Sequence, residues 1–162
     1  MGNRLKDKVA IITGAAKGIG FATAQRFAQE GAIVIIADMN LESVKGAAAQ
    51  IPNAEAYAMN VTDRASIQAV VDQVMQKHGH IDILINNASA INLTPTEATP
   101  AKRFDLMFDV NVRGTFLTSQ AAIPHLRESA KAGRNPHILT LSPPLSMKAK
   151  WFQHHVAYTM AK

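Results

Sequence analysis

Five short hydrophobic runs recur along the chain and are separated by stretches with helical spacing or composition. The runs are almost wholly hydrophobic rather than alternating, which is typical of strands buried on both faces of a parallel sheet. They cover Val9–Thr13, Ile33–Asp38, Ala56–Val61, Ile81–Asn86 and His137–Ser142, and the helical stretches between them are roughly Gly18–Glu30, Leu41–Gln50, Arg64–His78 and Pro100–Ala130. This alternation predicts an α/β fold, a Rossmann-type doubly wound parallel sheet in three layers (α/β/α).

Local signals set the expected ends of the helices. Thr99 followed by Pro100 suggests an N-cap with proline at the first helical position. Asp63 is the expected N-cap of the third helical stretch, with Thr62 as the alternative. Pro124 is expected to kink the last helical stretch rather than end it.

Size and composition narrow the class of protein without changing this fold. The 162 residues, 48% of them hydrophobic and 18% charged, fit one soluble domain spanning 1–162. No hydrophobic run approaches the roughly 18 residues that cross a bilayer, and the N-terminus lacks the hydrophobic segment of a signal peptide. We therefore expect a cytoplasmic protein without a membrane partner.

Charge and metal-ligand residues argue against two further classes of protein. The net charge is +5, but the 17 Lys and Arg residues are scattered, so we expect a solvated basic surface and no nucleic-acid partner. Cysteine is absent, which excludes disulfides and thiolate metal sites. His154 and His155 are adjacent and poorly placed to share one ion, so no metal site is expected.

The first hydrophobic run leads into a glycine-rich turn, Thr13–Gly20, and a helical stretch follows it. Glycine lets the backbone turn sharply and approach a diphosphate closely, while the first amides of the helix supply N–H donors and positive potential. The residues expected to hold a dinucleotide here are Gly14, Lys17, Gly18, Ile19 and Gly20. A tight turn without a ligand is the alternative, but the strand before the turn and the helix after it favour dinucleotide binding.

An acidic residue closes the second hydrophobic run. Asp38 follows Gly20 by 18 residues, close to the position where a carboxylate binds the adenosine ribose. A carboxylate there repels the 2′-phosphate of NADP and accepts a hydrogen bond from the 2′-hydroxyl of NAD, whereas Lys17 beside the turn favours the phosphate. Because like charges discriminate strongly, we expect NAD as the cofactor in preference to NADP.

Tyr158 and Lys162 stand four residues apart, so on a helix both side chains face the same way. A tyrosine with a pKa of roughly 10 is a poor base at neutral pH, but a neighbouring ammonium stabilises the phenolate and lowers that pKa. Such a pair can move a proton while a nicotinamide moves a hydride. On the spacing alone, however, an ordinary surface helix is the better explanation.

Four motifs, in this order and spacing, resemble those of the short-chain dehydrogenase/reductase family. They are Thr13–Gly20, Asn86–Ser89, Asn111 within Asp109–Val112, and Tyr158 with Lys162, so the resemblance covers the whole chain. The first half, especially Ile33–Asn40, looks like bacterial NAD-dependent polyol dehydrogenases. The second half is closer to the hydroxysteroid dehydrogenase-like subgroup, for instance at Leu141–Pro144.

This resemblance implies catalytic roles for three residues. Tyr158 would donate or accept the proton, Lys162 would bind the nicotinamide ribose and tune the tyrosine, and Asn111 would hold a water in a proton relay. The reaction would be an NAD(P)-dependent hydride transfer between the cofactor and a secondary alcohol or carbonyl substrate, in a homodimer or homotetramer. A non-catalytic dinucleotide-binding or scaffold module is the alternative, because the chain departs from the family pattern in two respects.

The resemblance also implies which other residues meet the cofactor. Asn60 and Val61 match the stretch that packs beside the adenine. Asn87 and Ala88 match the segment that closes the fourth strand against the cofactor, although asparagines that only stabilise a turn are the alternative for Asn86 and Asn87.

The first departure concerns the serine that polarises the substrate carbonyl, which in the family lies 13 residues before the tyrosine. That position holds Leu145 here, and an alignment on the fifth strand gives Pro143 instead. Ser142 and Ser146 remain as candidates, and we favour Ser142 because the end of the strand fixes its position. A hydroxyl that bonds its own backbone is the alternative for Ser142.

The second departure concerns length. Members of the family continue beyond the equivalent of Lys162 with two more strands and a lid over the substrate, so the resemblance implies a C-terminally incomplete Rossmann domain. Without those strands the fifth strand is expected to form an exposed hydrophobic edge.

Overall fold

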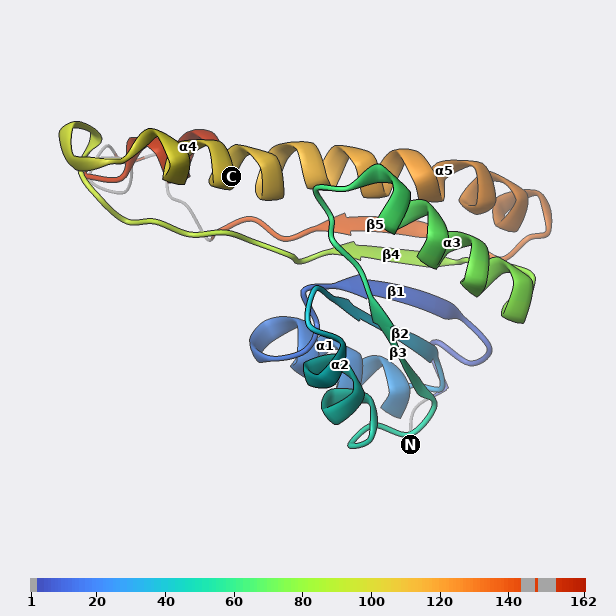
Figure 1. Cartoon of the computed structure of the whole chain (residues 1–162). Helices are drawn as coiled ribbons and strands as arrows, with labels where there is room; N and C mark the ends of the chain where they lie inside the picture. Colours follow the sequence, from blue (N-terminus) through green and yellow to red (C-terminus); the bar gives the residue numbers. More distant parts are fainter. Residues whose placement is uncertain (1–2, 144–147, 149–153) are drawn as a thin grey trace.

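The structure, a computed structural model, describes residues 3–143, 148 and 154–162 and has a five-stranded parallel sheet at its centre (Figure 1). The strands are β1 (Val9–Thr13), β2 (Ile33–Asp38), β3 (Ala54–Ala58), β4 (Ile83–Asn86) and β5 (His137–Thr140). Their spatial order is β3-β2-β1-β4-β5, so the chain builds outward from β1 in one direction and then in the other.

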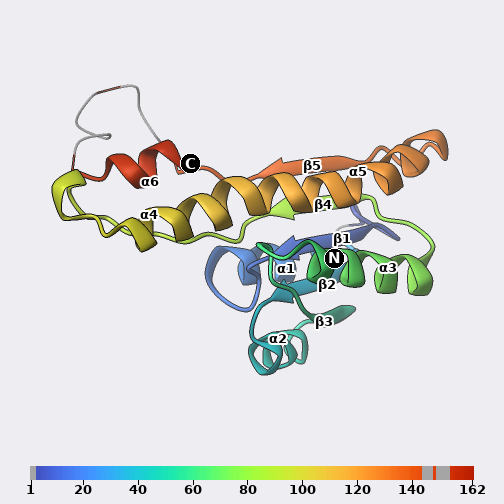
Figure 2. The same cartoon turned by 45° about the horizontal axis from the view of Figure 1, so that its top comes forward.

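Helices cover both faces of this sheet, as Figures 1 and 2 show. One layer contains α1 (Gly18–Gln29) and α2 (Leu41–Ala48), and the other contains α3 (Arg64–His78) and α5 (Thr115–Lys131). The expected three-layer, doubly wound α/β fold is therefore confirmed. Before α5 come a short 3-10 helix (Thr96–Ala98), α4 (Ala101–Met107) and a π-helix (Phe108–Gly114), and α6 (Val156–Met160) lies beside α4.

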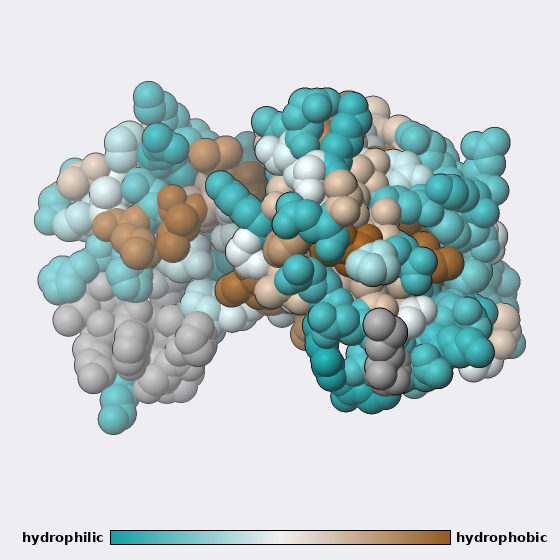
Figure 3. All heavy atoms as spheres, turned by 90° about the horizontal axis from the view of Figure 1, so that it is seen from below, coloured by the Kyte–Doolittle hydropathy of each residue, from teal (hydrophilic) through white to brown (hydrophobic). Residues whose placement is uncertain are grey.

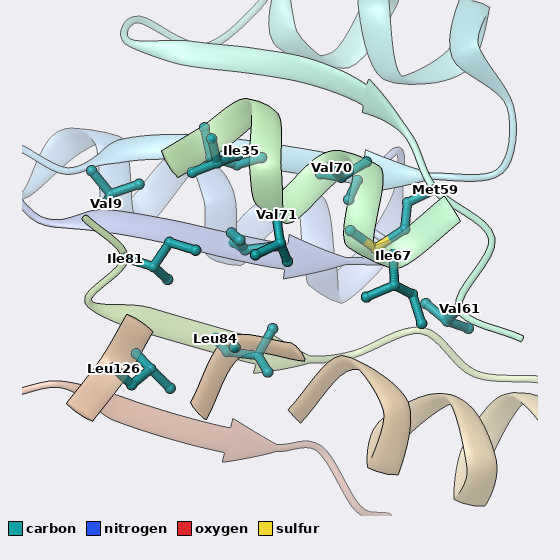
Figure 4. Packing of buried hydrophobic residues seen from close by; sticks show 14 of the residues in the cluster. Val9, Ile35, Met59, Val61, Ile67, Val70, Val71, Ile81, Leu84 and Leu126 are labelled. Atoms are coloured by element: carbon teal, nitrogen blue, oxygen red, sulfur yellow. The ribbon is translucent and has the colours of Figure 1, made fainter. Parts of the chain in front are cut away.

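The hydrophobic core lies on both sides of the sheet because successive strand residues point to opposite faces. In β1, Val9 and Ile11 pack towards α3 and α5, whereas Ala10 and Ile12 pack towards α1 and α2. Figure 4 shows how Val71 of α3 lies over the strands on the first of these faces. These four residues of β1 are buried, which explains why the strand is hydrophobic up to Thr13, the buried polar residue that ends it.

Three strands differ in their ends from the prediction, because a hydrophobic run does not reveal where ladder hydrogen bonds begin. The structure has Ala54–Ala58 where Ala56–Val61 was expected, Ile83–Asn86 where Ile81–Asn86 was expected, and His137–Thr140 where His137–Ser142 was expected. In the first case the strand pairs with β2 up to Ala58 opposite Asp38. Beyond it, the Asn60 side chain accepts hydrogen bonds from the backbone N–H and the hydroxyl of Thr62, which turns the chain towards α3.

The helix ends confirm one predicted cap and correct another. Asp63 caps α3, since its carboxylate accepts a hydrogen bond from the backbone N–H of Ala65 at 3.0 Å. Thr99 is not a cap. Pro100 occupies the N-cap of α4, while the Thr99 hydroxyl donates backwards to the carbonyl of Pro95 at 2.9 Å.

The stretch predicted as one helix over Pro100–Ala130 consists of α4, the π-helix and α5 in sequence. Pro124 lies inside α5 and does not end it, as expected. The π-helix was not predicted, because a single inserted residue in a helix leaves little trace in the hydrophobic spacing.

The outer side of β5 forms the exposed hydrophobic edge that was expected. Ile138 and Leu139 are 41% and 53% exposed. On the face drawn in Figure 3 most of the surface is hydrophilic, and the hydrophobic residues gather in separate patches. Among the described residues, no helix is long and hydrophobic enough to cross a membrane.

A buried carboxylate ties together the amino ends of three strands. The Asp82 side chain, fully buried just before β4, accepts hydrogen bonds from the backbone N–H of Val9 at 2.9 Å and from Arg134 Nε and Nη2 at 2.7 and 2.9 Å. His80 Nε2 lies 3.4 Å from the same carboxylate. Burial on its own raises the pKa of Asp82, but the hydrogen bonds from Arg134 and Val9 outweigh it and hold the pKa below its ordinary value of 3.8.

We expect Asp82→Asn to lower the free energy of unfolding at pH 7 by about 3 kcal/mol, at the low end for a broken buried ion pair because Arg134 keeps some solvent contact. Urea unfolding measures this loss. The control is Asp72→Asn on α3, where the carboxylate is exposed and accepts a hydrogen bond from Gln68; it should change stability by less than roughly 0.5 kcal/mol.

The same pair of proteins should differ in its response to pH. Because the pKa of Asp82 is lower in the folded state, its stabilising effect is present above pH 3.8 and is lost as the pH falls through the folded value. The stability difference between the parent chain and Asp82→Asn should therefore shrink in acid. A constant difference from pH 7 to pH 3 would contradict this assignment.

Candidate functional site

The glycine-rich turn packs directly against the segment that follows β4. Gly14 has a φ of +64°, and a Cβ built on it would lie 2.7 Å from the Cα of Ala88. A Cβ on Gly20 would lie 2.5 Å from Nδ2 of Asn87 and 2.7 Å from the carbonyl oxygen of Gly14. Glycine is therefore required at both positions because no side chain fits between the turn and this segment.

Hydrogen bonds fix the same contact. Asn87 Nδ2 donates to the carbonyls of Thr13 and Gly14, each at 2.9 Å. In return the Thr13 hydroxyl accepts hydrogen bonds from the backbone N–H of Asn87 at 3.1 Å and of Ala88 at 3.0 Å. The role of Thr13 was missed in the sequence, where the only signal was a hydroxyl residue at the end of a hydrophobic strand.

The first turn of α1 presents its amides without a competing side chain. Lys17 occupies the N-cap in an extended conformation and makes no side-chain cap hydrogen bond, and the first turn contains no acidic residue. Lys17 and Gly18 are exposed, and Ile19 is 69% exposed. The free N–H groups and the positive end of the helix dipole thus face solvent, an arrangement that binds anions such as phosphate.

A cavity of about 270 Å³ lies beside this turn. It is lined by Gly14, Asp38, Met39, Met59, Val61, Ala88, Ser89, Ala90, Leu106 and Val110. Most of these side chains are hydrophobic, so the cavity suits a flat, apolar group that carries a polar substituent near Asp38. The predicted site residues Gly14, Asp38, Val61 and Ala88 come together here, whereas Met59, Leu106 and Val110 were missed because hydrophobic residues do not stand out in a sequence.

Asp38 also lines a second, more polar hollow of about 560 Å³, together with Lys17, Asn40 and Ser43. One oxygen of its carboxylate accepts a hydrogen bond from the backbone N–H of Met39 at 2.8 Å. Asp38 and Lys17 thus line one hollow.

Asn60 and Val61 were both predicted to lie beside the adenine, but only Val61 lines the cavity. The side-chain oxygen of Asn60 accepts hydrogen bonds from the N–H of Thr62 at 3.0 Å and from its hydroxyl at 2.9 Å, and the backbone N–H of Asn60 donates to Ser66. The contribution of Asn60 is to the turn that carries Val61 into position.

The π-helix holds Asn111 against the segment after β4. Asn111 is buried, its Oδ1 accepts a hydrogen bond from the N–H of Ala90, and its Nδ2 donates to the carbonyl of Ala90, both at 2.9 Å. A Cβ on Gly114, at the end of the π-helix, would lie 2.9 Å from Val61 Cγ2. The π-helix therefore packs on the wall of the cavity, and a relay water on Asn111 would share the amide with Ala90.

Tyr158 lies in α6, half-buried against a small hydrophobic cluster that contains Met107 and Ala157, with Ala90 packed on it. Lys162 follows the helix, and its Nζ donates to the carbonyl of Leu141 at 2.9 Å. Among the hydrogen bonds of the described residues none joins Lys162 to Tyr158. Burial lowers the pKa of the Lys162 ammonium below its ordinary value.

The candidates for the carbonyl-polarising serine are only partly described. Ser142 follows β5, is exposed, and its hydroxyl donates to the backbone carbonyl of Lys162 at 3.2 Å. The alternative expected from the sequence was a Ser142 hydroxyl that bonds its own backbone. The hydroxyl does bond a backbone carbonyl, but that carbonyl belongs to Lys162. Leu145 and Ser146 lie outside the described residues.

Comparisons with known proteins extend this geometry. The family model for short chain dehydrogenase matches residues 8–162. Hydroxysteroid dehydrogenase-like protein 2 is 49% identical in Danio rerio and 45% identical in Homo sapiens, over 98% of this chain in each case. A solved structure of 3-ketoacyl-(acyl-carrier-protein) reductase from Brucella melitensis, complexed with NADH, matches with a TM-score of 0.88 and 32% identity over 97% of this chain.

These alignments cover only part of the matched proteins. The chain spans 40% of the length of the two curated relatives and 64% of the reductase chain.

We expect Gly20→Ala to lower the free energy of unfolding by about 2–3 kcal/mol, because the added methyl group must displace Asn87 or the turn backbone. Thermal or urea unfolding measures the effect. Gly46→Ala in α2 is the matched control, since a Cβ there meets nothing within 4 Å; it should be neutral or stabilise by roughly 0.5–1 kcal/mol. Equal stability of the two variants would show that the turn is looser than described.

Proposed function

Because this chain belongs to the short-chain dehydrogenase family, we propose that it binds NAD in preference to NADP and takes part in hydride transfer between that cofactor and a secondary alcohol or carbonyl substrate. The observation that carries the proposal is the cavity between the glycine-rich turn and Asp38, which opens beside the free amides of α1.

The shape and chemistry of this region support a place for each part of the dinucleotide. The first amides of α1 would hold the diphosphate, because Gly14 and Gly20 allow the backbone to come close. Met59 and Val61 would hold the adenine in the hydrophobic cavity that they line. Asp38, at the carboxyl end of β2, would bind the ribose between them.

The choice between NAD and NADP depends on the two charged groups of the polar hollow. The carboxylate of Asp38 belongs to the sheet and is held by the N–H of Met39, whereas the Lys17 side chain is exposed. A fixed carboxylate repels a 2′-phosphate more effectively than a mobile, hydrated ammonium attracts it. The Brucella melitensis reductase, which is complexed with NADH, is consistent with this preference.

At the other end of the site, Tyr158 exchanges a proton with the substrate oxygen. A nicotinamide bound there would supply or accept the hydride. Lys162, whose ammonium is held at the Leu141 carbonyl, would bind the nicotinamide ribose. Asn111 fixes Ala90, and Ala90 and Tyr158 both pack on the hydrophobic cluster that contains Met107.

A non-catalytic dinucleotide-binding module is the second candidate function. It is favoured by the region after β5, where either alignment places a residue without a hydroxyl, Leu145 or Pro143, at the position of the family serine. The Ser142 hydroxyl donates to the carbonyl of Lys162. If no hydroxyl polarises the substrate carbonyl, roughly 3–4 kcal/mol of transition-state stabilisation is lost. The chain would then retain cofactor binding with little turnover.

Cofactor preference can be measured by fluorescence titration with NADH and NADPH. We expect the parent chain to bind NADH more tightly, and Asp38→Ala to weaken NADH binding about 10-fold or more through the loss of a charged hydrogen-bond acceptor. Binding of NADPH should become tighter as the repulsion is removed. The matched control is Glu42→Ala, which removes an exposed carboxylate from the same hollow; it should leave the preference for NADH unchanged.

Failure of the parent chain to bind either dinucleotide would overturn the proposed function. If Glu42→Ala and Asp38→Ala change NADH and NADPH binding equally, Asp38 acts only through its negative charge and not through a specific contact with the ribose.

The proton-transfer role can be separated from cofactor binding. We expect Tyr158→Phe to reduce alcohol-dependent NADH formation at least about 100-fold, because the ring keeps its packing but loses the hydroxyl. Binding of NADH should stay within about twofold of the parent, and Tyr57→Phe on β3 is the matched control. A parent chain that binds NADH but turns over none of a panel of secondary alcohols would favour the non-catalytic module.

A further inference from the structure

A polar cluster outside the cavity lies where β4, β5 and α5 meet; its members Asn86 and Thr118 are buried, whereas Thr140 is exposed. Asn86 is the last residue of β4 and Thr118 lies in the first turn of α5, and each is 3% exposed. Thr140 ends β5 beside them. None of these residues contacts the proposed adenosine cavity, and the family motif explains only Asn86.

The hydrogen bonds in this cluster run through the amide of Asn86. Its Oδ1 lies 2.6 Å from the hydroxyl of Thr118, which donates to it, and its Nδ2 donates to Ser119 Oγ at 3.0 Å and to Thr140 Oγ1 at 3.4 Å. The Thr118 hydroxyl also lies 2.8 Å from the carbonyl of Gly114, at the end of the π-helix. No buried side-chain nitrogen or oxygen of the described residues lacks a partner, so this cluster is closed.

The backbone of Asn86 extends the cluster towards Lys162. Its carbonyl accepts a hydrogen bond from the N–H of Leu141 at 3.0 Å, and the carbonyl of Leu141 in turn accepts the hydrogen bond from Lys162 Nζ at 2.9 Å. Asn86 thus holds Thr140 with its side chain and Leu141 with its backbone. These two contacts, to Thr140 and to Leu141, position the Leu141 carbonyl that accepts the hydrogen bond from Lys162 Nζ.

We propose that Thr118 is a positioning residue for Lys162: its hydroxyl fixes the Asn86 amide, the amide fixes the end of β5, and the end of β5 places the Leu141 carbonyl that holds the ammonium. The consequence for cofactor binding rests on the proposed function, but the chain of contacts does not.

The hydroxyl is the part of Thr118 that matters. Valine has nearly the same shape but cannot donate, so it would leave Asn86 Oδ1 as a buried acceptor without a partner. The amide would rotate to find another donor and release Thr140. Serine keeps the donor and loses only a methyl group, so Thr118→Ser should preserve the arrangement.

The primary experiment is an NMR titration of lysine side chains, with the Lys162 signal assigned through Lys162→Arg. In Thr118→Val the pKa of Lys162 should fall relative to the parent, because the ammonium loses an acceptor that favours the charged form. Thr118→Ser should retain the parent value. Thr115→Val, three residues earlier in the same helix, is the matched control, because only its backbone carbonyl contacts Thr118.

The second experiment compares the two ends of the cofactor. Thr118→Val should weaken binding of NADH roughly fivefold and leave binding of AMP within about twofold, because Lys162 lies at the nicotinamide end and AMP lacks that end.

An unchanged Lys162 titration in a folded Thr118→Val variant would overturn the proposal, as would equal losses of NADH and AMP binding. Full recovery in Thr118→Ser separates the hydroxyl from the packing of the side chain. If the parent chain binds no NADH, the proposed function fails, whereas the Lys162 titration still decides this inference because it requires no cofactor.

Discussion

The close contact between the turn after β1 and the segment after β4 is the constraint on which the candidate site depends. The parallel pairing of the two strands, with Ile12 opposite Ile85, brings Thr13 beside Asn87. The contact is so close that a Cβ at Gly14 would touch the Ala88 backbone. Because β1 also pairs with β2, the order of the sheet reverses at this point, and a crevice opens at the carboxyl ends of the strands.

The fold could be predicted because the three central strands, β1, β2 and β4, are buried on two faces, and this leaves continuous hydrophobic runs in the sequence. The predicted family resemblance is likewise confirmed, together with its hydroxysteroid dehydrogenase-like subgroup. The positions of the strand ends were predicted less well: β3 ends at Ala58, opposite Asp38, although hydrophobic residues continue at Met59 and Val61. Thr99 failed as a cap because its hydroxyl is used by the turn before it.

The site was predictable where a residue is defined by backbone geometry or charge, as with Gly14 and Asp38. It was not predictable where a residue acts through contacts with distant elements. The sequence contains no sign that the Asn60 amide closes a turn or that the Lys162 ammonium binds the Leu141 carbonyl, because both depend on tertiary placement. The π-helix around Asn111 could not be predicted from the sequence either.

Polar residues at the two ends of strand β4 link the stability of the sheet to the candidate site. The four residues of β4, Ile83–Asn86, are buried, and polar groups hold both ends. At the amino end Asp82 binds Arg134 and the β1 backbone, while at the carboxyl end Asn86 binds α5 and β5. A strand of this length cannot shift its register without breaking a buried hydrogen bond at one of these ends. The distance from Asp82 to the carbonyl that holds Lys162 is therefore fixed by the sheet, so the polar groups at the amino end help to set the geometry at the carboxyl end.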